Sequence, residues 1–323
     1  MLGAGGVPGY AFHVGVLAAL ADHGHWDARG AELIVGTSAG AGIASLLRAG
    51  LSPLDLYAHT LGRRLSPEGD ALLARLPSAA WDSGAERPGR SGPASVALAA
   101  RGLLRWPPRP GVILAGALPR GRRSPTPLGD RHRAVHTRWP DAALWLCALR
   151  VGDGRRTVFG RDDHPPLDVG TAVEASCAVP GRFDPVAVGD ERYLDGGTWS
   201  ATNADLVARL GFDAVVVVAP LSTPRLVATS PRRLATGGRS WSEPGRVLSR
   251  AYHRAVLEAE VRRVVHAGTP VITIEPTEDD LGLLDGPGPS GRVDVAEQAY
   301  ASVTARLRQD RDLTVLLNAP VPA

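Results

Sequence analysis

A serine inside a glycine-flanked pentapeptide is the first candidate for chemistry in this sequence. The segment Gly36-Thr37-Ser38-Ala39-Gly40 has the pattern G-x-S-x-G. A short apolar run precedes it and a helical pattern follows it, so we expect Ser38 on a sharp strand-to-helix turn that exposes its oxygen as a nucleophile. The amide of Ala39 would then lie at a helix N-terminus, where free N–H groups favour negative charge. On this motif alone, the alternative is a Gly/Ser-rich connection without chemistry.

A glycine-rich loop near the start of the chain is the second candidate. The segment Gly3-Ala4-Gly5-Gly6-Val7-Pro8-Gly9 directly precedes a helical pattern. Backbone amides crowded at a helix start form an anion site, which in an acyl-transfer enzyme would be an oxyanion hole. A dinucleotide-binding loop would need a third glycine where this chain has Pro8, and a strand where only Met1-Leu2 stands. The dinucleotide interpretation is therefore disfavoured.

The third candidate is Asp195-Gly196-Gly197, which follows a short predicted strand. Asp-Gly pairs are common in ordinary tight turns, so this motif alone is weak. Its neighbourhood strengthens it, because A-S-C-A-V-P-G precedes it at 175–181 and T-N-A-D follows it at 202–205.

In order and spacing together, these five motifs resemble the patatin-like phospholipase family. The resemblance covers residues 3–50 and 143–220 well and the remainder loosely. It implies a three-layer α/β/α fold with helices on both faces of the sheet, and a Ser–Asp dyad instead of a triad. It further implies that Ser38 is the nucleophile and Asp195 its general base. The resemblance implies an oxyanion hole formed by the amides of Gly5, Gly6 and Ala39. The glycines that it implies as part of the motifs are Gly9, Gly36, Gly40, Gly196 and Gly197.

The glycine-rich loop departs from the family's usual G-G-G-x-R/K-G. Ala4 replaces the first glycine, and Pro8 replaces the basic residue. Proline carries no N–H, so the hole would depend on Gly5, Gly6 and Val7, which affects the catalytic rate more than the fold. Lipid acyl hydrolysis is therefore the leading hypothesis, with phospholipids or lysophospholipids as substrates. The alternatives are a non-lipid carboxylesterase on the same site and a catalytically weak regulatory or binding protein.

A Ser–His–Asp triad is the rival chemistry. In an α/β-hydrolase the histidine follows the acid, on a loop after a late strand. Only His253 and His266 follow Asp195, and both fall in one long helical pattern, which disfavours a triad. A carboxylate with an ordinary pKa of about 4 is a weak base, so Asp195 would need close positioning and strong help from the oxyanion hole.

The elements that must position these residues alternate between apolar runs and helical patterns, which predicts an α/β fold with a mostly parallel sheet. Strands are expected at 32–35, 143–151, 157–160, 192–194, 213–219 and 271–275. Helices are expected at 10–22, 39–49, 53–61, 93–104, 111–118, 169–177, 203–210, 244–266 and 293–308, with a loop at 222–243. Because only two residues precede the glycine-rich loop, we also expect the native chain to have a further strand before Leu2.

The composition predicts one domain over residues 1–323, with a loosely patterned Arg/Pro/Gly-rich segment at about 62–140. All 36 basic residues are arginine, and residues 61–140 contain 14 of them against five acidic residues. Such an excess suits an anionic membrane surface, and Trp81, Trp106 and Trp139 would border the mouth of the active site. The alternative is a solvated, loop-rich insertion.

Several other classes of protein are disfavoured. No apolar run approaches the roughly 18 residues of a membrane span. Cys147 and Cys177 are too few for a disulfide framework and are expected as reduced core residues of a cytosolic protein. Zinc spacing is not found. We therefore predict a cytoplasmic protein with an acyl lipid substrate, peripheral contact with an anionic membrane, and no metal, cofactor or nucleic acid.

Overall fold

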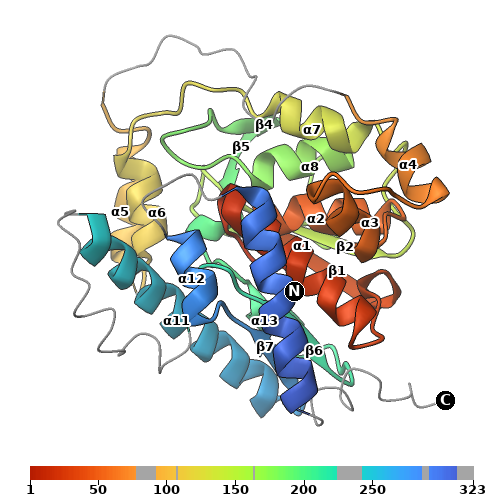
Figure 1. Ribbon diagram of the computed structural model, residues 1–323. Coiled ribbons are helices and arrows are strands. Elements are labelled where there is room, and N and C mark those ends of the chain that lie inside the picture. The colour runs from red at the N-terminus through yellow and green to blue at the C-terminus, as the bar shows by residue number, and fades with distance from the viewer. Residues whose placement is uncertain (78–91, 107, 163, 224–241, 286–290, 311–323) are drawn as a thin grey trace. The chain divides into compact units, whose positions relative to one another are not determined.

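The computed structural model describes residues 1–77, 92–106, 108–162, 164–223, 242–285 and 291–310 (Figure 1). The chain forms two compact units, each built from segments distant in the sequence. Unit 1 contains Met1–Ala31, Ser52–Leu65 and Thr202–Ala323, and unit 2 contains Glu32–Leu51 and Ser66–Ala201. Whether they function as the single domain expected from the composition stays a prediction.

Unit 2 is built on a mixed sheet. Its strands are β1 (Leu33–Thr37), β2 (Ala143–Arg150), β3 (Arg156–Phe159), β4 (Val186–Val188) and β5 (Glu191–Asp195). β1 runs parallel to β2, whereas β3 and β5 run antiparallel to β2, and β4 antiparallel to β5. The expectation of a mostly parallel sheet was therefore wrong. β2–β3 and β4–β5 are hairpins with short connections, which can join only antiparallel strands.

The register of β2 brings two predicted site residues to one place. Thr37 of β1 pairs with Cys147, and Asp195 of β5 pairs with the next residue, Ala148. β3 pairs with residues 146–149 of β2, which include residues that also pair with β1 and residues that also pair with β5. Because each edge of a strand pairs with one neighbour at a given residue, β3 lies on one edge of β2, and β1 and β5 both lie on the other. The carboxyl ends of these two strands therefore meet end to end, and Ser38 directly follows one of them.

The helices of unit 2 form two groups. The first group, α2 (Ala39–Arg48), α7 (Thr126–Arg133) and α8 (Val169–Ser176), packs together, with α2 and α8 against the strands. The second is a hairpin of α5 (Val96–Leu104) and α6 (Pro110–Ala117). With α4 (Pro67–Leu73), four short helices occupy the segment expected to be loosely patterned, of which residues 78–91 and 107 lie outside the described part.

Unit 1 combines helices with two parallel strands. The helices are α1 (Gly6–Asp22), α3 (Pro53–Thr60), α11 (Ser242–His266), α12 (Glu278–Leu284) and α13 (Arg292–Gln309). The strands β6 (Val215–Val218) and β7 (Val271–Ile274) pair with each other, and Leu2 forms a parallel bridge to Val218. Helix α1 is buried along most of its length and packs against α13 and α3.

One helix expected in unit 1 is absent as an α-helix. Residues Ala204–Val207 form a 3₁₀ turn in place of the α-helix expected at 203–210. Asn203 adopts a left-handed conformation with a φ of 52°, and Glu260 of α11 accepts hydrogen bonds from the amide of Ala204 and the hydroxyl of Thr202. The T-N-A-D motif is thus bound by a tertiary contact. Most of the predicted loop at 222–243 lies outside the described residues.

Within the part of the chain that the structure describes, no helix has the combination of length and apolar character needed to cross a bilayer.

Candidate active site

Ser38 lies, as expected, on the turn between β1 and α2. Its φ of 53° is uncommon for a residue with a side chain, and such strained backbone is found at functional turns. Gly36 permits the sharp reversal, because a Cβ atom there would lie only 2.6 Å from the Cα atom of Ala41. The first glycine of G-T-S-A-G is therefore required by a close backbone approach.

Two consecutive residues at the end of α8 hold the backbone of Ser38 from both sides. The amide of Ser38 donates to Ser176 Oγ at 2.9 Å, and the Ser176 hydroxyl donates to the carbonyl of Cys147 on β2 at 2.7 Å. The Cys177 thiol donates to the carbonyl of Ser38 at 3.2 Å. The sequence pointed to the A-S-C-A-V-P-G motif but gave neither residue a role. The signal that could have pointed to Ser176 and Cys177 was the position of the A-S-C-A-V-P-G motif, between the G-T-S-A-G and D-G-G motifs in the sequence.

The cysteines are not part of a disulfide bond in the described structure. Cys147 is buried, as expected, whereas Cys177 is only half-buried and lies at the site. The residue as a whole is half-buried, but its thiol is shielded from water; this burial, with the nearby carboxylates of Asp195 and Glu174, raises the pKa of the Cys177 thiol well above its ordinary value. Cys177 therefore stays protonated at neutral pH and keeps the proton that it donates to Ser38.

Replacing Ser176 by alanine is expected to lower kcat about tenfold with little change in KM. The substitution leaves the buried amide of Ser38 without this acceptor, which costs about 1–3 kcal/mol, and it loosens the turn that aims the nucleophile. Ser45→Ala is the matched control, because Ser45 is equally buried and bonds His132 instead of the nucleophile turn. Both variants should lose stability in urea, and only Ser176→Ala should lose kcat. Equal kcat values would contradict the positioning role.

Asp195 ends β5 with a buried carboxylate, only 4% exposed. It accepts hydrogen bonds from the side chain of Ser38 and, at 2.7 Å, from the amide of Gly197. Burial raises the pKa of Asp195 to about 6, although both hydrogen bonds oppose the rise. The group is thus mostly ionised at pH 7, and it is a stronger base than the ordinary carboxylate assumed from the sequence.

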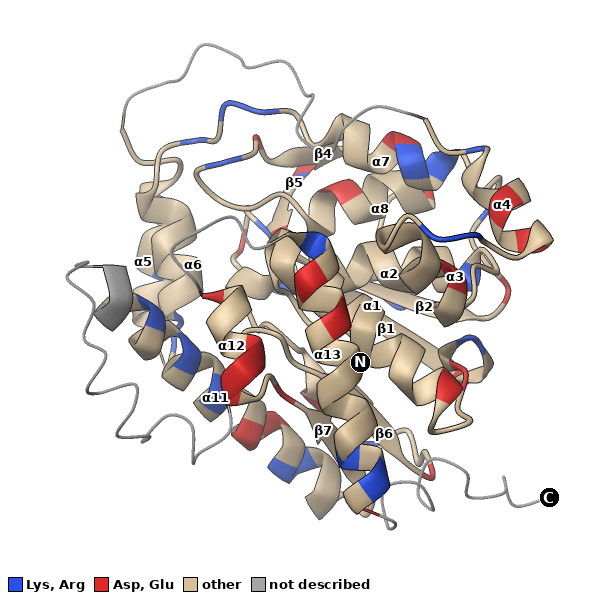
Figure 2. Ribbon diagram, viewed as in Figure 1, with Lys and Arg blue, Asp and Glu red and all other residues tan. Residues whose placement is uncertain are grey.

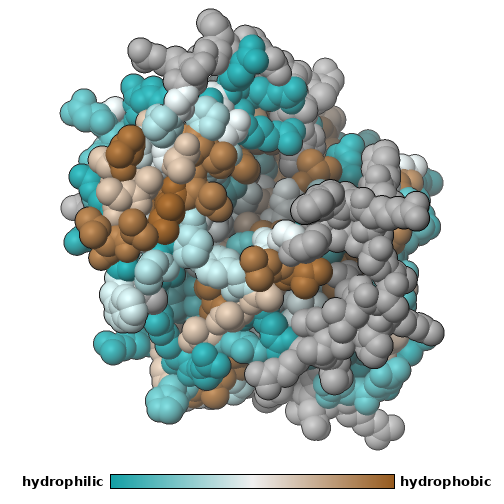
Figure 3. All heavy atoms as spheres, turned by 90° about the vertical axis from the view of Figure 1, so that its left-hand side faces the viewer, coloured by the Kyte–Doolittle hydropathy of each residue, from teal (hydrophilic) through white to brown (hydrophobic). Residues whose placement is uncertain are grey.

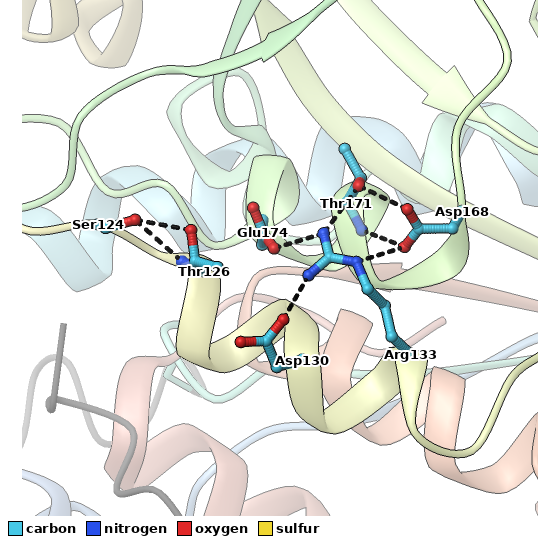
Figure 4. A network of polar contacts seen from close by, with 7 residues as sticks. All are labelled: Ser124, Thr126, Asp130, Arg133, Asp168, Thr171 and Glu174. Atoms are coloured by element: carbon cyan, nitrogen blue, oxygen red, sulfur yellow. Dashed lines mark hydrogen bonds and ion pairs between the residues drawn. The ribbon is translucent and has the colours of Figure 1, made fainter. Parts of the chain in front are cut away.

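The guanidinium group of Arg133 connects α7 to α8, the helix whose C-terminal end bonds the backbone of Ser38. Figure 4 shows Arg133 of α7 reaching three carboxylates, two of them on or next to α8. It contacts Glu174 at 2.6 Å and Asp168 at 3.0 Å, and it also bonds Asp130 at 2.8 Å. Burial raises the pKa of Glu174, and Arg133 opposes this. Because Glu174 stands two residues before Ser176, the ion pair connects α7 to the part of α8 that contacts the Ser38 turn.

The glycine-rich loop belongs to unit 1. A Cβ atom on Gly5 would lie 2.6 Å from the Cα atom of Gly9, so the loop is tightly folded on itself. Helix α1 begins at Gly6, and Pro8 therefore lies in its first turn, where an N–H group has no partner within the helix. Pro8 thus costs the helix no hydrogen bond. Ser38, Ala39 and Asp195 lie together in unit 2, and the place of Gly5 and Gly6 in an oxyanion hole stays a prediction.

A comparison with known families agrees with the motifs. Residues 1–208 match the profile of the family described as Patatin-like phospholipase. The chain belongs to this family. The match spans all five motifs, from the glycine-rich loop to T-N-A-D. A comparison with curated proteins gives no match.

Membership of the patatin-like phospholipase family confirms the predicted fold class. The strands and helices of the two units form a mixed α/β structure, consistent with the family's α/β/α fold. At the level of the family, the chain is a lipid acyl hydrolase.

Proposed function

We propose that the protein is a serine acyl hydrolase in which Ser38 and Asp195 form a catalytic dyad, with acyl esters of phospholipids, lysophospholipids or related lipids as substrates. The observation that carries the proposal is the meeting of β1 and β5 at Cys147 and Ala148 of β2, which brings Ser38 to the buried Asp195 carboxylate, where its side chain acts as a hydrogen-bond donor. Family membership supports the lipid class.

The mechanism has two steps of acyl transfer. Asp195 accepts the proton of Ser38 as the serine oxygen attacks the ester carbonyl. As the bond from the carbonyl carbon to the alcohol oxygen breaks, Asp195 returns this proton to the leaving alcohol, and an acyl-enzyme remains. Water then hydrolyses the acyl-enzyme by the same route. The amide of Ala39, at the N-terminus of α2, would stabilise the oxyanion together with Gly5 and Gly6. A base with a pKa near 6 is suited to work at neutral pH.

The triad alternative has less support. His253 and His266 lie on α11, the long helix expected from the sequence. Burial lowers the pKa of His253 to about 4, and Arg250 adds to this effect. His253→Ala should therefore keep nearly full activity, whereas a loss without unfolding would favour the triad.

Covalent labelling by a fluorophosphonate probe tests the dyad. The wild-type protein should be labelled, Ser38→Ala should not, and Ser45→Ala should react like the wild type. The labelling rate should rise as the pH increases through about 6, because Asp195 must be ionised to accept the proton. Labelling of Ser38→Ala would contradict the nucleophile. An unlabelled but folded wild-type protein would favour the weak regulatory alternative.

A series of esters with increasing acyl length separates the lipid hydrolase from a general carboxylesterase. The proposal expects kcat/KM to rise with acyl length, since a lipid hydrolase gains binding energy from the longer chain. A preference for short esters would favour the carboxylesterase.

A further inference from the structure

The α5–α6 hairpin has an apolar face that no described part of unit 2 covers. One side of the hairpin is inside the unit, where Leu98 and Val112 are at most 1% exposed. Large side chains on the helices and at their ends are instead 40% to 92% exposed. These residues, which we call the α5–α6 face, are Val96, Leu103, Leu104, Trp106, Leu114 and Leu118. Figure 3 shows hydrophobic atoms gathered on the side of the molecule that carries this hairpin.

The stretch of chain that carries the α5–α6 face has charge of one sign. The segment 87–129 contains eight arginines and no aspartate or glutamate. The ribbon from α5 to α7 accordingly carries basic residues and no acidic one before Asp130 (Figure 2). A segment that combines exposed apolar side chains with arginine is complementary to a surface with anionic head groups above an apolar layer.

The turn between the two helices is anchored while its tip is exposed. The guanidinium groups of Arg105 and Arg109 lie over the Trp199 ring, 4.9 Å and 4.4 Å from its centre. Between them in the sequence, Trp106 is 92% exposed. Tryptophan favours the boundary between water and lipid, so a fixed turn presents a residue suited to that boundary. Of the other expected tryptophans, Trp139 is half-buried, and Trp81 lies outside the described residues.

The hairpin is attached to the turn that follows Asp195. Helix α6 packs against the 3₁₀ turn Gly196–Thr198, and a Cβ atom on Gly111 would overlap the carbonyl oxygen of Thr198. A surface bound by the hairpin would therefore lie near the proposed general base.

We propose that the α5–α6 face docks the protein on an anionic phospholipid membrane. The leucines and Trp106 enter the interfacial layer, and the arginines meet the phosphates of the lipid head groups. This inference rests on the proposed function, because docking on a membrane would bring an acyl hydrolase to its acyl lipid substrates. Membrane binding itself does not require catalysis.

The test measures co-sedimentation with vesicles in the Ser38→Ala background, which leaves the lipids intact. Phosphatidylcholine vesicles are compared with vesicles that also contain phosphatidylglycerol. Binding should be stronger to the anionic vesicles and should weaken with salt. Leu103→Ser with Leu104→Ser should lower the partition coefficient at least about tenfold. The control pair, Leu54→Ser with Leu210→Ser, removes exposed leucines outside this face and should bind like its parent.

A second pair of variants separates the charge contribution. Arg120→Gln with Arg122→Gln should weaken binding to the anionic vesicles and reduce its salt dependence, with little effect on neutral ones. All four leucines are exposed, so thermal unfolding should confirm that each variant is folded.

Equal binding of the Leu103/Leu104 variant and its parent would overturn the proposal. So would indifference to anionic lipid, or self-association through this face without vesicle binding. The proposed function can fail independently of membrane docking. In that case the wild-type protein would bind vesicles but would not be labelled by the fluorophosphonate probe.

Discussion

Replacing Asp195 by asparagine is expected to abolish ester hydrolysis and to make the folded protein more stable at pH 8. Asparagine keeps an acceptor oxygen for the amide of Gly197 but cannot take the proton of Ser38. The rate should fall at least about 10³-fold, and the double variant with Ser38→Ala should be little worse than either single one. Full activity of Asp195→Asn would exclude the dyad.

The expected gain in stability follows from the pKa of Asp195. Burial raises it to about 6 from the ordinary 3.8, so the folded state binds the proton more tightly than the unfolded state does. The resulting stabilisation is fully present below pH 3.8 and is lost as the pH rises through 6. The loss is about 3 kcal/mol at neutral pH, and asparagine avoids it. Urea unfolding at pH 4, 6 and 8 should show the two proteins diverging as the pH increases.

Asp168→Asn provides the control with the opposite sign. Partial burial opposes the shift, but hydrogen bonds from Thr171 and the charge of Arg133 together lower the pKa of Asp168. That carboxylate stabilises the protein above its unfolded pKa, and its replacement should lower stability at pH 8. If the free energy of unfolding changed with pH in the same way in the wild type and in Asp195→Asn, burial would not raise the pKa of Asp195.

Gly36→Ala is expected to damage both stability and catalysis. Its Cβ atom would lie 2.6 Å and 2.7 Å from backbone atoms of Ala41 and Gly40, so β1 and the start of α2 must move apart. We expect a loss of about 3 kcal/mol in the free energy of unfolding. The labelling rate should fall about 100-fold, because small displacements of a nucleophile are costly.

A glycine with open space around it serves as the control for this substitution. A Cβ atom on Gly282 of α12 would meet no other described atom within 4 Å. Gly282→Ala should leave labelling unchanged and add up to about 1 kcal/mol of stability. If Gly36→Ala behaved in the same way, the close backbone approach would not be limiting.

Local sequence was sufficient for the parts of the fold that local interactions determine. The valine run at 215–218 forms a buried strand, and most predicted helices begin and end within a few residues of their observed limits. The strand-to-helix turn at Ser38 could be predicted because it depends on neighbouring residues. The role of Ser176 could not be found in this way, because it depends on contact between segments 138 residues apart.

The errors have the same physical origin. The sheet is mixed because β3 and β5 pair antiparallel with β2, a long-range choice that periodicity does not show, and the strand at Val186–Val188 is too short to predict. Residues 204–207 form a 3₁₀ turn instead of the expected α-helix, and their contacts with Glu260 join segments that are distant in the sequence. Helix α7 was missed because it is short and polar on most of its surface, and ion pairs formed by Arg133 join it to α8.

The end-to-end meeting of β1 and β5 has a consequence for how this site tolerates change. The spacing between Ser38 and Asp195 is measured along β2, from Cys147 to Ala148, by backbone hydrogen bonds. Backbone pairing does not depend on which side chains occupy the strands. The exposed side of the α5–α6 hairpin can therefore vary in composition without altering that distance. The surface that the hairpin would bind and the ester hydrolysis proposed for Ser38 and Asp195 can thus be changed independently, by selection or by engineering.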